Sequence, residues 1–131
     1  MKAYVQLITI ACCISLTGCA TMQRTDLYFG RTIPGGGQVT DEQWKNFSDS
    51  VISRYFPEGY TEVAATGRWR DTQTKETITE PSVVVTFLGK ASARRNAALD
   101  SVTRQYIRGF HQQSVLRADS KTRIRFIEKT P

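Results

Sequence analysis

Residues 82–88 read SVVVTFL, with three consecutive valines. β-Branched and aromatic side chains favour a strand, in which alternate residues point to opposite faces of the sheet. Both faces of this strand are apolar: Val83, Val85 and Phe87 on one, Val84 and Leu88 on the other. A half-solvated sheet shows one polar face. We therefore predict a central strand whose second face is covered by another copy of the chain or by a loop, or lines a pocket.

The segments around this strand alternate between strand and helix patterns. Thr40 is an expected helix N-cap with Gln43 at the capping-box position, and Pro57 ends that helix. The terminal segment is either one bent strand or two short strands around a turn at Asp119 and Ser120. In chain order we expect a strand at 27–33, a helix at 40–55, strands at 60–70 and 82–88, a helix at 91–112 and the terminal segment at 114–127.

Each predicted helix carries an apolar stripe that can dock on a sheet. The stripes are Trp44, Phe47, Val51 and Tyr55 on the first helix and Leu99, Val102, Tyr106 and Phe110 on the second. The order β-α-β-β-α-β is that of a ferredoxin-like sandwich. The predicted fold class is α+β: an antiparallel sheet with strands 27–33 and 82–88 in the middle and both helices on one face. An extra C-terminal hairpin strand is left open.

The N-terminus has the pattern of a secretory signal. Lys2 precedes an uncharged apolar run at 4–16, and small residues follow. The run is too short to span a bilayer, which takes about 20 apolar residues in a helix. A buried N-terminal helix is the alternative, but the run has no amphipathic period.

Leu16-Thr17-Gly18-Cys19 resembles the lipobox of bacterial lipoproteins. The resemblance implies cleavage after Gly18 and acyl chains on Cys19, which together anchor a protein firmly. We expect a signal peptide at 1–18, a lipidated cysteine with a short tether at 19–25, and one domain at 26–131. Ala20 resembles the residue of lipoproteins forwarded to the outer membrane. The expected location is the cell envelope, membrane-anchored and facing the periplasm, at the outer membrane.

Composition excludes several chemistries. After cleavage Cys19 is the remaining cysteine, and His111 is the single histidine of the 131 residues. We therefore predict no metal site, no cofactor and no Ser-His-Asp or Cys-His catalytic set. The periplasmic location excludes nucleic acid as a partner.

Positive charge is concentrated in the last third of the chain. Residues 90–131 carry ten basic and three acidic side chains, a net +7, whereas residues 19–89 carry seven and nine, a net −2. A basic face on a short tether suits an anionic lipid, lipopolysaccharide phosphates or an acidic envelope protein, with a merely solvated helix face as the alternative. The candidate contacts are Arg94, Arg104, Arg108, Arg123 and Arg125.

Several short motifs together resemble the family catalogued as domain of unknown function 3574, over residues 27–127. They are LYFGRTIP at 27–34, YFPEGYT at 55–61, GRWRD at 67–71, EPS at 80–82 and, at 106–117, a tyrosine followed by FHQQSVLR. The resemblance implies a small secreted or lipid-anchored bacterial domain without an assigned activity. Within these motifs this chain has Arg68 and Gln113 where the family pattern has glutamine and glutamate.

Two groups of polar residues are candidates for ligand binding. Trp69 between Arg68 and Arg70 could stack on a ring and pair an anion. The second group is Tyr28, Arg31, Glu80, Ser82, Gln112 and Ser114. We expect the strands of Tyr28 and Ser82 to run parallel, so that both residues lie at one end of the sheet. Gln112 and Ser114 then approach the opposite end near Arg31, and no single catalytic cluster forms.

The function predicted on these grounds is a lipid-anchored envelope lipoprotein that acts as a non-enzymatic binding or assembly module, dimeric through its open sheet face. The alternative is a small cofactor-free enzyme that resembles dimeric α/β-barrel enzymes, with a pocket against the sheet that includes Tyr28 and Trp69. A third reading is an envelope spacer without a ligand.

Overall fold

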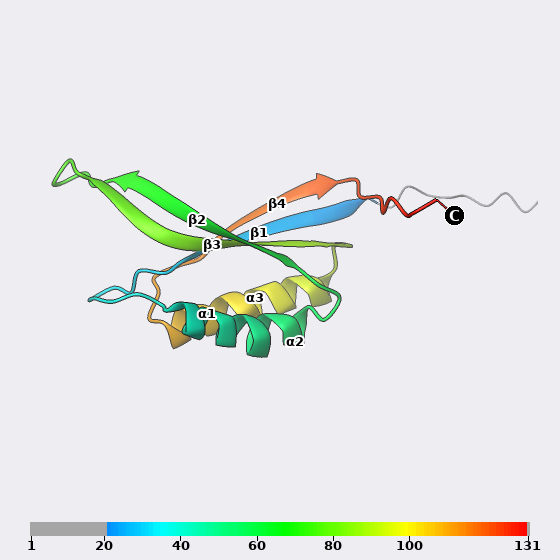
Figure 1. Cartoon of the computed structure of the whole chain (residues 1–131), viewed down its shortest axis with the longest axis horizontal. Coiled ribbons are helices and arrows are strands. Elements are labelled where there is room, and N and C mark those ends of the chain that lie inside the picture. Colours follow the sequence, from blue (N-terminus) through cyan, green and yellow to red (C-terminus); the bar gives the residue numbers. More distant parts are fainter. Residues whose placement is uncertain (1–20, 131) are drawn as a thin grey trace, which may run out of the picture.

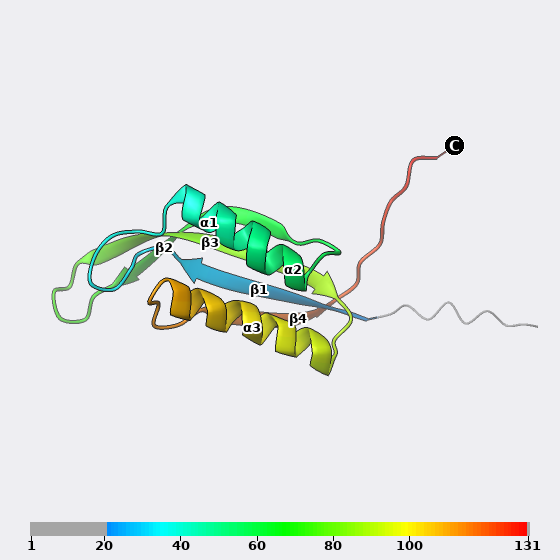
Figure 2. The same ribbon diagram turned by 90° about the horizontal axis from the view of Figure 1, so that it is seen from below.

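The computed structural model describes residues 21–130. The elements are β1 (Met22–Gly30), α1 (Asp41–Phe47), the π-helical turn η1 (Ser48–Ile52), α2 (Ser53–Tyr55), β2 (Thr61–Arg70), β3 (Thr77–Gly89), α3 (Ala93–Gly109) and β4 (Leu116–Thr122). The sheet order is β2-β3-β1-β4 and every neighbouring pair is antiparallel. Both helical segments lie on one face of the sheet (Figures 1 and 2). The ferredoxin-like α+β prediction is confirmed, with the SVVVTFL stretch inside the central strand β3.

Two strand boundaries differ from the sequence prediction. β1 begins at Met22, so most of the expected tether at 19–25 pairs with β3 and β4. β3 begins at Thr77, and part of the expected polar connection is therefore the second arm of a β2–β3 hairpin that projects past the helices (Figure 1). Both extensions are polar and exposed along one face, which is why hydrophobic periodicity does not find them.

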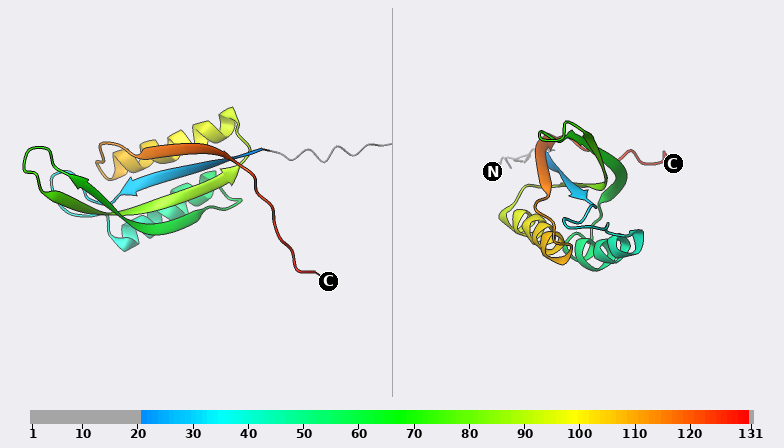
Figure 3. Two further views of the ribbon diagram at one scale, coloured as in Figure 1. Left: turned by 90° about the horizontal axis from the view of Figure 1, so that it is seen from above. Right: turned by 90° about the vertical axis from the view of Figure 1, so that its left-hand side faces the viewer.

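The terminal segment forms one strand rather than a hairpin. β4 runs straight through Asp119, and within residues 21–130 no strand follows Thr122. Arg123 and Arg125 lie beyond the strand, in the segment that leaves the sheet (Figure 3). Asp119 stays in the strand because the Thr25 hydroxyl and the Gln23 amide donate to its carboxylate at 2.6 and 2.9 Å.

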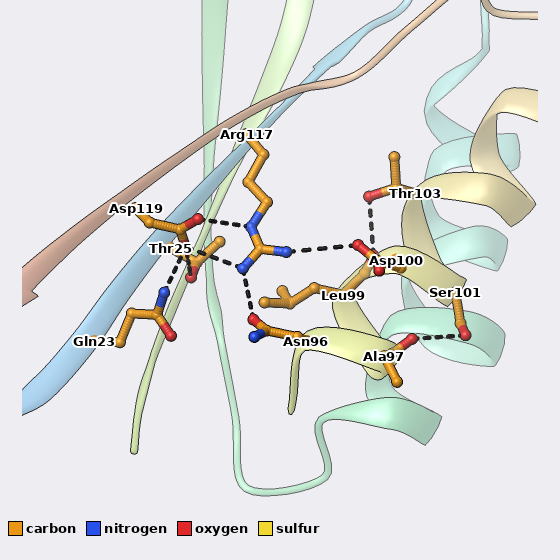
Figure 4. A network of polar contacts seen from close by, with 10 residues as sticks. All are labelled: Gln23, Thr25, Asn96, Ala97, Leu99, Asp100, Ser101, Thr103, Arg117 and Asp119. Atoms are coloured by element: carbon orange, nitrogen blue, oxygen red, sulfur yellow. Dashed lines mark hydrogen bonds and ion pairs between the residues drawn. The ribbon is translucent and has the colours of Figure 1, made fainter. Parts of the chain in front are cut away.

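The Arg117 side chain connects β4 to α3 by hydrogen bonds and an ion pair (Figure 4). Its guanidinium donates to Asp119 at 2.8 Å within β4 and to the Asn96 side chain of α3 at 2.8 Å, and it lies 3.5 Å from Asp100. Partial burial works against the charged form of Asp119, but the hydrogen bonds from Thr25 and Arg117 hold the pKa of Asp119 below its ordinary value. This polar network closes the β4 edge against α3.

The core between sheet and helices is rich in aromatic rings. Phe29 of β1 is fully buried, and its ring centre lies 4.8 Å from Tyr106, 5.2 Å from Trp44 and 6.1 Å from Phe47, mostly edge to face. The Tyr106 hydroxyl donates to the carbonyl of Gly30 at 2.8 Å. Burial raises the pKa of Tyr106 well above its ordinary value, so the hydroxyl keeps its proton and remains a donor.

The first helix shifts its buried face by one residue at η1. Trp44 and Phe47 are buried as predicted, but Ile52 and Phe56 are buried in place of the expected Tyr55, which is 39% exposed. A π-helical turn inserts one residue into the helix and rotates everything after it. The turn is held by Ser48, whose hydroxyl donates to Glu62 of β2 and lies 2.8 Å from the Tyr60 hydroxyl.

Candidate functional site

The strand register places most of the candidate residues on the sheet face that carries no helix. On β1 the buried residues Leu27 and Phe29 face the helices, so Tyr28 and Gly30 face the other way. Gly30 pairs with Ser82 of β3, and Glu80 of β3 pairs with Gly67 of β2. Figure 3 (left) views this open face, with the helices behind the strands.

A hollow of about 550 Å³ lies on this face, at the end of the sheet where β1 ends and β3 begins. Its walls come from all four strands, from the loop after β1 and from the segment between α3 and β4. We call it the sheet hollow. The residues that line it are Tyr28, Gly30, Thr32, Pro34, Gly67, Trp69, Ile78, Glu80, Ser82, Gln112, Gln113, Ser114 and Leu116.

Glu80 lies over Gly30 in the floor of the hollow. A Cβ atom at position 30 would lie 2.5 Å from Oε1 of Glu80, closer than two such atoms can come. Gly30 does not adopt a left-handed backbone conformation, and a larger residue here would displace the Glu80 carboxylate from its present position. The Thr32 amide donates to Oε1 at 3.2 Å. Within residues 21–130 no ion pair reaches Glu80.

Large apolar side chains stand around this carboxylate. Trp69 is 51% exposed and Leu116 is 63% exposed, and Tyr28 pairs directly with Leu116 across β1 and β4. Trp69 pairs with Ile78, next to the Gly67–Glu80 pair. The hollow therefore combines accessible aromatic rings with a carboxylate, and Glu80 is the one charged residue among those that line it.

The polar candidates converge, contrary to the sequence prediction. Tyr28, Glu80, Ser82, Gln112 and Ser114 all line the sheet hollow together with Trp69. The prediction failed because β1 and β3 are antiparallel, which brings the end of β1 beside the beginning of β3. Helix α3 also ends at this edge of the sheet, where the Gln112 amide donates to the Thr32 carbonyl at 2.9 Å.

The three candidate arginines lie elsewhere. Arg68 and Arg70 alternate with Trp69 along β2 and therefore point to the opposite face, so they do not flank its ring. Arg70 instead donates to the carbonyl of Lys75 in the β2–β3 turn at 3.1 Å. Arg31 donates to the Val39 carbonyl at 2.8 Å and pairs with Asp41 at 2.7 Å, which closes the loop between β1 and α1.

On the other half of the open face, polar side chains pair with one another and hold neighbouring strands together. Asp26 accepts from the Thr86 hydroxyl at 2.6 Å and from Arg24 at 2.9 Å. Partial burial opposes its ionisation, but these two hydrogen bonds hold the pKa of Asp26 below its ordinary value. Beyond it, Val63 and Leu88 are exposed, and no described residue covers them.

The basic candidates on α3 are exposed as predicted: Arg94, Arg104 and Arg108 all lie on the solvent side of that helix. In the part of the chain that the structure describes, no three His, Cys, Asp or Glu side chains come together as a metal site. No helix of residues 21–130 has the length and apolar character to cross a membrane. Cys19, Ala20 and the signal at 1–18 lie outside the described residues.

Together the fold and the site define a small ferredoxin-like α+β domain with a carboxylate-bearing hollow on its open sheet face. The chain belongs to the family described as protein of unknown function (DUF3574), which matches residues 24–126. No curated protein matches the sequence. The match to this family confirms the family expected from the motifs.

Two solved structures of a phage SAM lyase share the fold. One is the complex with S-methyl-5'-thioadenosine and the other is the apo state; each has a TM-score of 0.56 and 15% sequence identity. The matches cover 85% and 83% of this chain and 95% and 94% of the phage chains. A likeness at this identity establishes the fold.

These structures correct the function predicted from the sequence. The prediction of a non-enzymatic binding or assembly module is wrong, because the solved structures that share the fold belong to an enzyme. The lipid anchor predicted with it concerns Cys19, which lies outside the described residues. One of the grounds for that prediction was the expected dispersal of the polar residues, and they converge instead.

The sequence-based candidates did not include seven residues of the hollow, namely Gly30, Thr32, Pro34, Gly67, Ile78, Gln113 and Leu116. The period-two alternation of β3, continued backward from Ser82 through Glu80, would have reached Ile78. The other six depend on strand pairing or on the path of the connecting segments, which hydrophobic periodicity does not specify.

Proposed function

We propose that this protein is a small enzyme that binds an organic cation with an attached ring in the sheet hollow. The observation that carries the proposal is the Glu80 carboxylate, held over Gly30 without an ion-pair partner and surrounded by exposed aromatic side chains. A hollow with these contents is complementary to a positive charge beside a flat apolar group.

Charge supports this choice of ligand. Burying a carboxylate under a neutral ligand would remove its hydration without compensation, whereas a bound cation replaces that hydration by ion pairing. Among the described residues, no lysine or arginine lines the hollow to compete for the carboxylate.

The aromatic residues support the same ligand class. A cation within about 6 Å of a tryptophan or tyrosine ring is attracted by about 0.5–2 kcal/mol, more when it is desolvated. Trp69 and Tyr28 are both accessible from the hollow. A ring attached to the cation could stack on Trp69 while the charge faces Glu80.

The phage SAM lyase favours an enzyme and a ligand of this kind. The compound SAM is a sulfonium cation attached to a nucleoside. A carboxylate beside such a cation can take a proton from the carbon β to it; the C–H electron pair forms a double bond, the C–S bond breaks, and a neutral sulfide leaves. Glu80 is the group of the hollow that could accept that proton.

Intrinsic fluorescence tests the ligand class. S-adenosylmethionine and S-adenosylhomocysteine differ only by one methyl group and the positive charge that it brings, so their comparison tests recognition of the methylsulfonium group. We expect S-adenosylmethionine, benzyltrimethylammonium or both to change the emission of the full chain, and the sulfonium to bind about tenfold more tightly than the thioether if the nucleoside fits.

The variant Trp69→Phe separates the two tryptophans, because Trp44 is buried in the core. It should lose the change in emission and keep the emission of Trp44. Equal affinity for the sulfonium and the thioether, or no binding of either cation, would contradict the proposal. Incubation followed by mass spectrometry then asks whether a bound cation is converted to a neutral sulfide or amine.

We further propose that Cys19 carries a lipid anchor that holds the domain at the envelope membrane, on the outer-membrane side indicated by Ala20. The lipobox at 16–19 and the apolar run before it support this location. β1 begins at Met22, so the folded domain would start within three residues of the anchor.

Replacing Cys19 by Ser should move the protein from the membrane pellet to the soluble fraction, because the acyl chains can no longer be attached. Membrane fractionation with an intact-mass measurement checks this, and Cys12→Ser serves as the matched control that keeps the anchor. A Cys19→Ser protein that stays in the pellet with the same lipid mass would refute the anchor.

A further inference from the structure

Arg95 is a charged residue in a core position. It begins the buried stripe of α3 that continues with Leu99, Val102 and Tyr106, and it is only 8% exposed. Arginine is rarely buried to this extent unless a partner neutralises it. The helix therefore places a guanidinium where the stripe would ordinarily hold an apolar side chain.

Two nitrogens of the Arg95 guanidinium have no hydrogen-bond partner among residues 21–130. Nε and Nη2 are fully buried and make no hydrogen bond to any described residue. The group lies 5.8 Å from the centre of the Phe56 ring, which attracts it but satisfies none of its N–H donors. Burial lowers the pKa of Arg95, yet a guanidinium stays charged in proteins, so the unsatisfied charge persists.

Gly89 of β3 lies beside this guanidinium. A Cβ atom at Gly89 would lie 2.8 Å from Nη1 of Arg95. Phe56 and Gly89, both near the guanidinium, line a hollow of about 380 Å³ at the end of the sheet where α3 begins. Arg95 thus reaches into this hollow from the helix.

The surroundings of this hollow are positive. Lys90 and Arg94 line it beside Arg95, and Glu58 is the single acidic residue that does so. The N-terminus of α3, capped by the Ser92 side chain at 3.0 Å, directs the positive end of a 17-residue helix toward the same place. Charge, helix dipole and unpartnered donors all favour an anion here.

We propose that this hollow is a phosphate-binding site in which the buried Arg95 guanidinium is the principal donor. Its two unpartnered nitrogens, Nε and Nη2, share one edge of the guanidinium plane, the geometry that binds two oxygens of a phosphate group at once. This edge is buried in the structure, so phosphate binding requires the Arg95 side chain to turn it toward the hollow. The site is separate from the sheet hollow and does not depend on the ligand proposed there.

The phosphate could belong to a lipid headgroup or to a soluble compound. β1 begins at the same end of the sheet, where Gln23 pairs with Gly89, so a membrane anchor at Cys19 would bring headgroups to this hollow (Figure 2). Both sources present the same chemical group to Arg95, and the test below distinguishes them.

The first measurement is calorimetric titration of the full chain, in a non-ionic detergent, with inorganic phosphate at constant ionic strength. We expect saturable binding that Arg95→Met weakens about tenfold or more, because methionine keeps the packing on Phe56 and removes the donors. The matched control Arg94→Met removes the same charge from an exposed neighbour and should weaken binding about threefold or less.

A second variant removes a negative charge from the hollow and leaves the buried core unchanged. Glu58→Gln should tighten phosphate binding severalfold by removing the one acidic residue of the hollow. It also keeps the proposal testable if Arg95→Met does not fold: unchanged phosphate affinity of Glu58→Gln would then overturn it.

Vesicles of phosphatidylglycerol in phosphatidylcholine supply the lipid arm. If headgroups are the source, Arg95→Met weakens vesicle binding more than Arg94→Met does. If soluble phosphates are the source, the two variants differ in their affinity for inorganic phosphate but not in their binding to vesicles. Either result supports the site. The proposal is overturned if the two variants bind each probe with the same affinity. It is also overturned if the wild-type protein binds neither probe, because the hollow beside Arg95 is then not a binding site.

Discussion

Replacing Glu80 by Gln is expected to weaken binding of the cation probes to the sheet hollow by about ten- to a hundredfold. The change keeps the size of the side chain and removes the one charge among the residues that line the hollow. Interactions of a charged group with its partner contribute about 1.5–3 kcal/mol, which corresponds to this loss in affinity. The cation probe that binds wild type more tightly is the one to measure, by fluorescence titration.

The matched control is Glu42→Gln. Glu42 is an exposed acid in the first turn of α1, on the helix side of the sheet, so its loss changes the net charge equally without entering the hollow. We expect its affinity for the cation to stay within about twofold of wild type because exposed charges interact weakly at this range. If both variants lose the same affinity, the cation is attracted by net charge and Glu80 has no special part.

Replacing Phe29 by Ala is expected to cost about 3–5 kcal/mol of unfolding free energy. Phe29 is fully buried on the central strand β1, and its ring touches both helical segments through Trp44, Phe47 and Tyr106. The cavity left behind removes the ring contacts between β1 and the two helical segments. For a domain of this size, a loss of 3–5 kcal/mol is a large part of the total stability.

Chemical denaturation of the full chain measures this loss, with Phe126→Ala as the same substitution at an exposed position. Phe126 is 87% exposed in the segment after β4, and its loss should change the unfolding free energy by no more than about 0.5 kcal/mol. Similar effects at positions 29 and 126 would mean that the aromatic cluster does not hold the two layers together.

The fold was largely predictable because its decisive elements carry strong local signals. The SVVVTFL stretch, apolar on both faces, became the central strand β3, and Thr40 with Gln43 forms the expected capping box. The buried face of the first helix was predicted incorrectly after Phe47. A π-helical turn depends on tertiary contacts of Ser48 and leaves no periodic signal in the sequence.

The residues of the site were predictable as types but not as a group. Tyr28, Ser82, Gln112 and Ser114 were all predicted as candidates, yet an error in one strand direction placed Gln112 and Ser114 at the opposite end of the sheet from the other two. Arg68 and Arg70 show the converse error, since neighbours in sequence lie on opposite faces of a strand. Arg95 went unnoticed because a single charge among nine other basic residues of the last third does not reveal its burial.

The central claim is that the sheet hollow holds an organic cation against Glu80. The most direct measurement is a crystal structure of the chain grown with the cation probe that binds more tightly. The account predicts the positive group within about 4–6 Å of the Glu80 carboxylate and the attached ring against Trp69. A cation bound on another surface, with Glu80 still bonded to the Thr32 amide alone in an empty hollow, would contradict it.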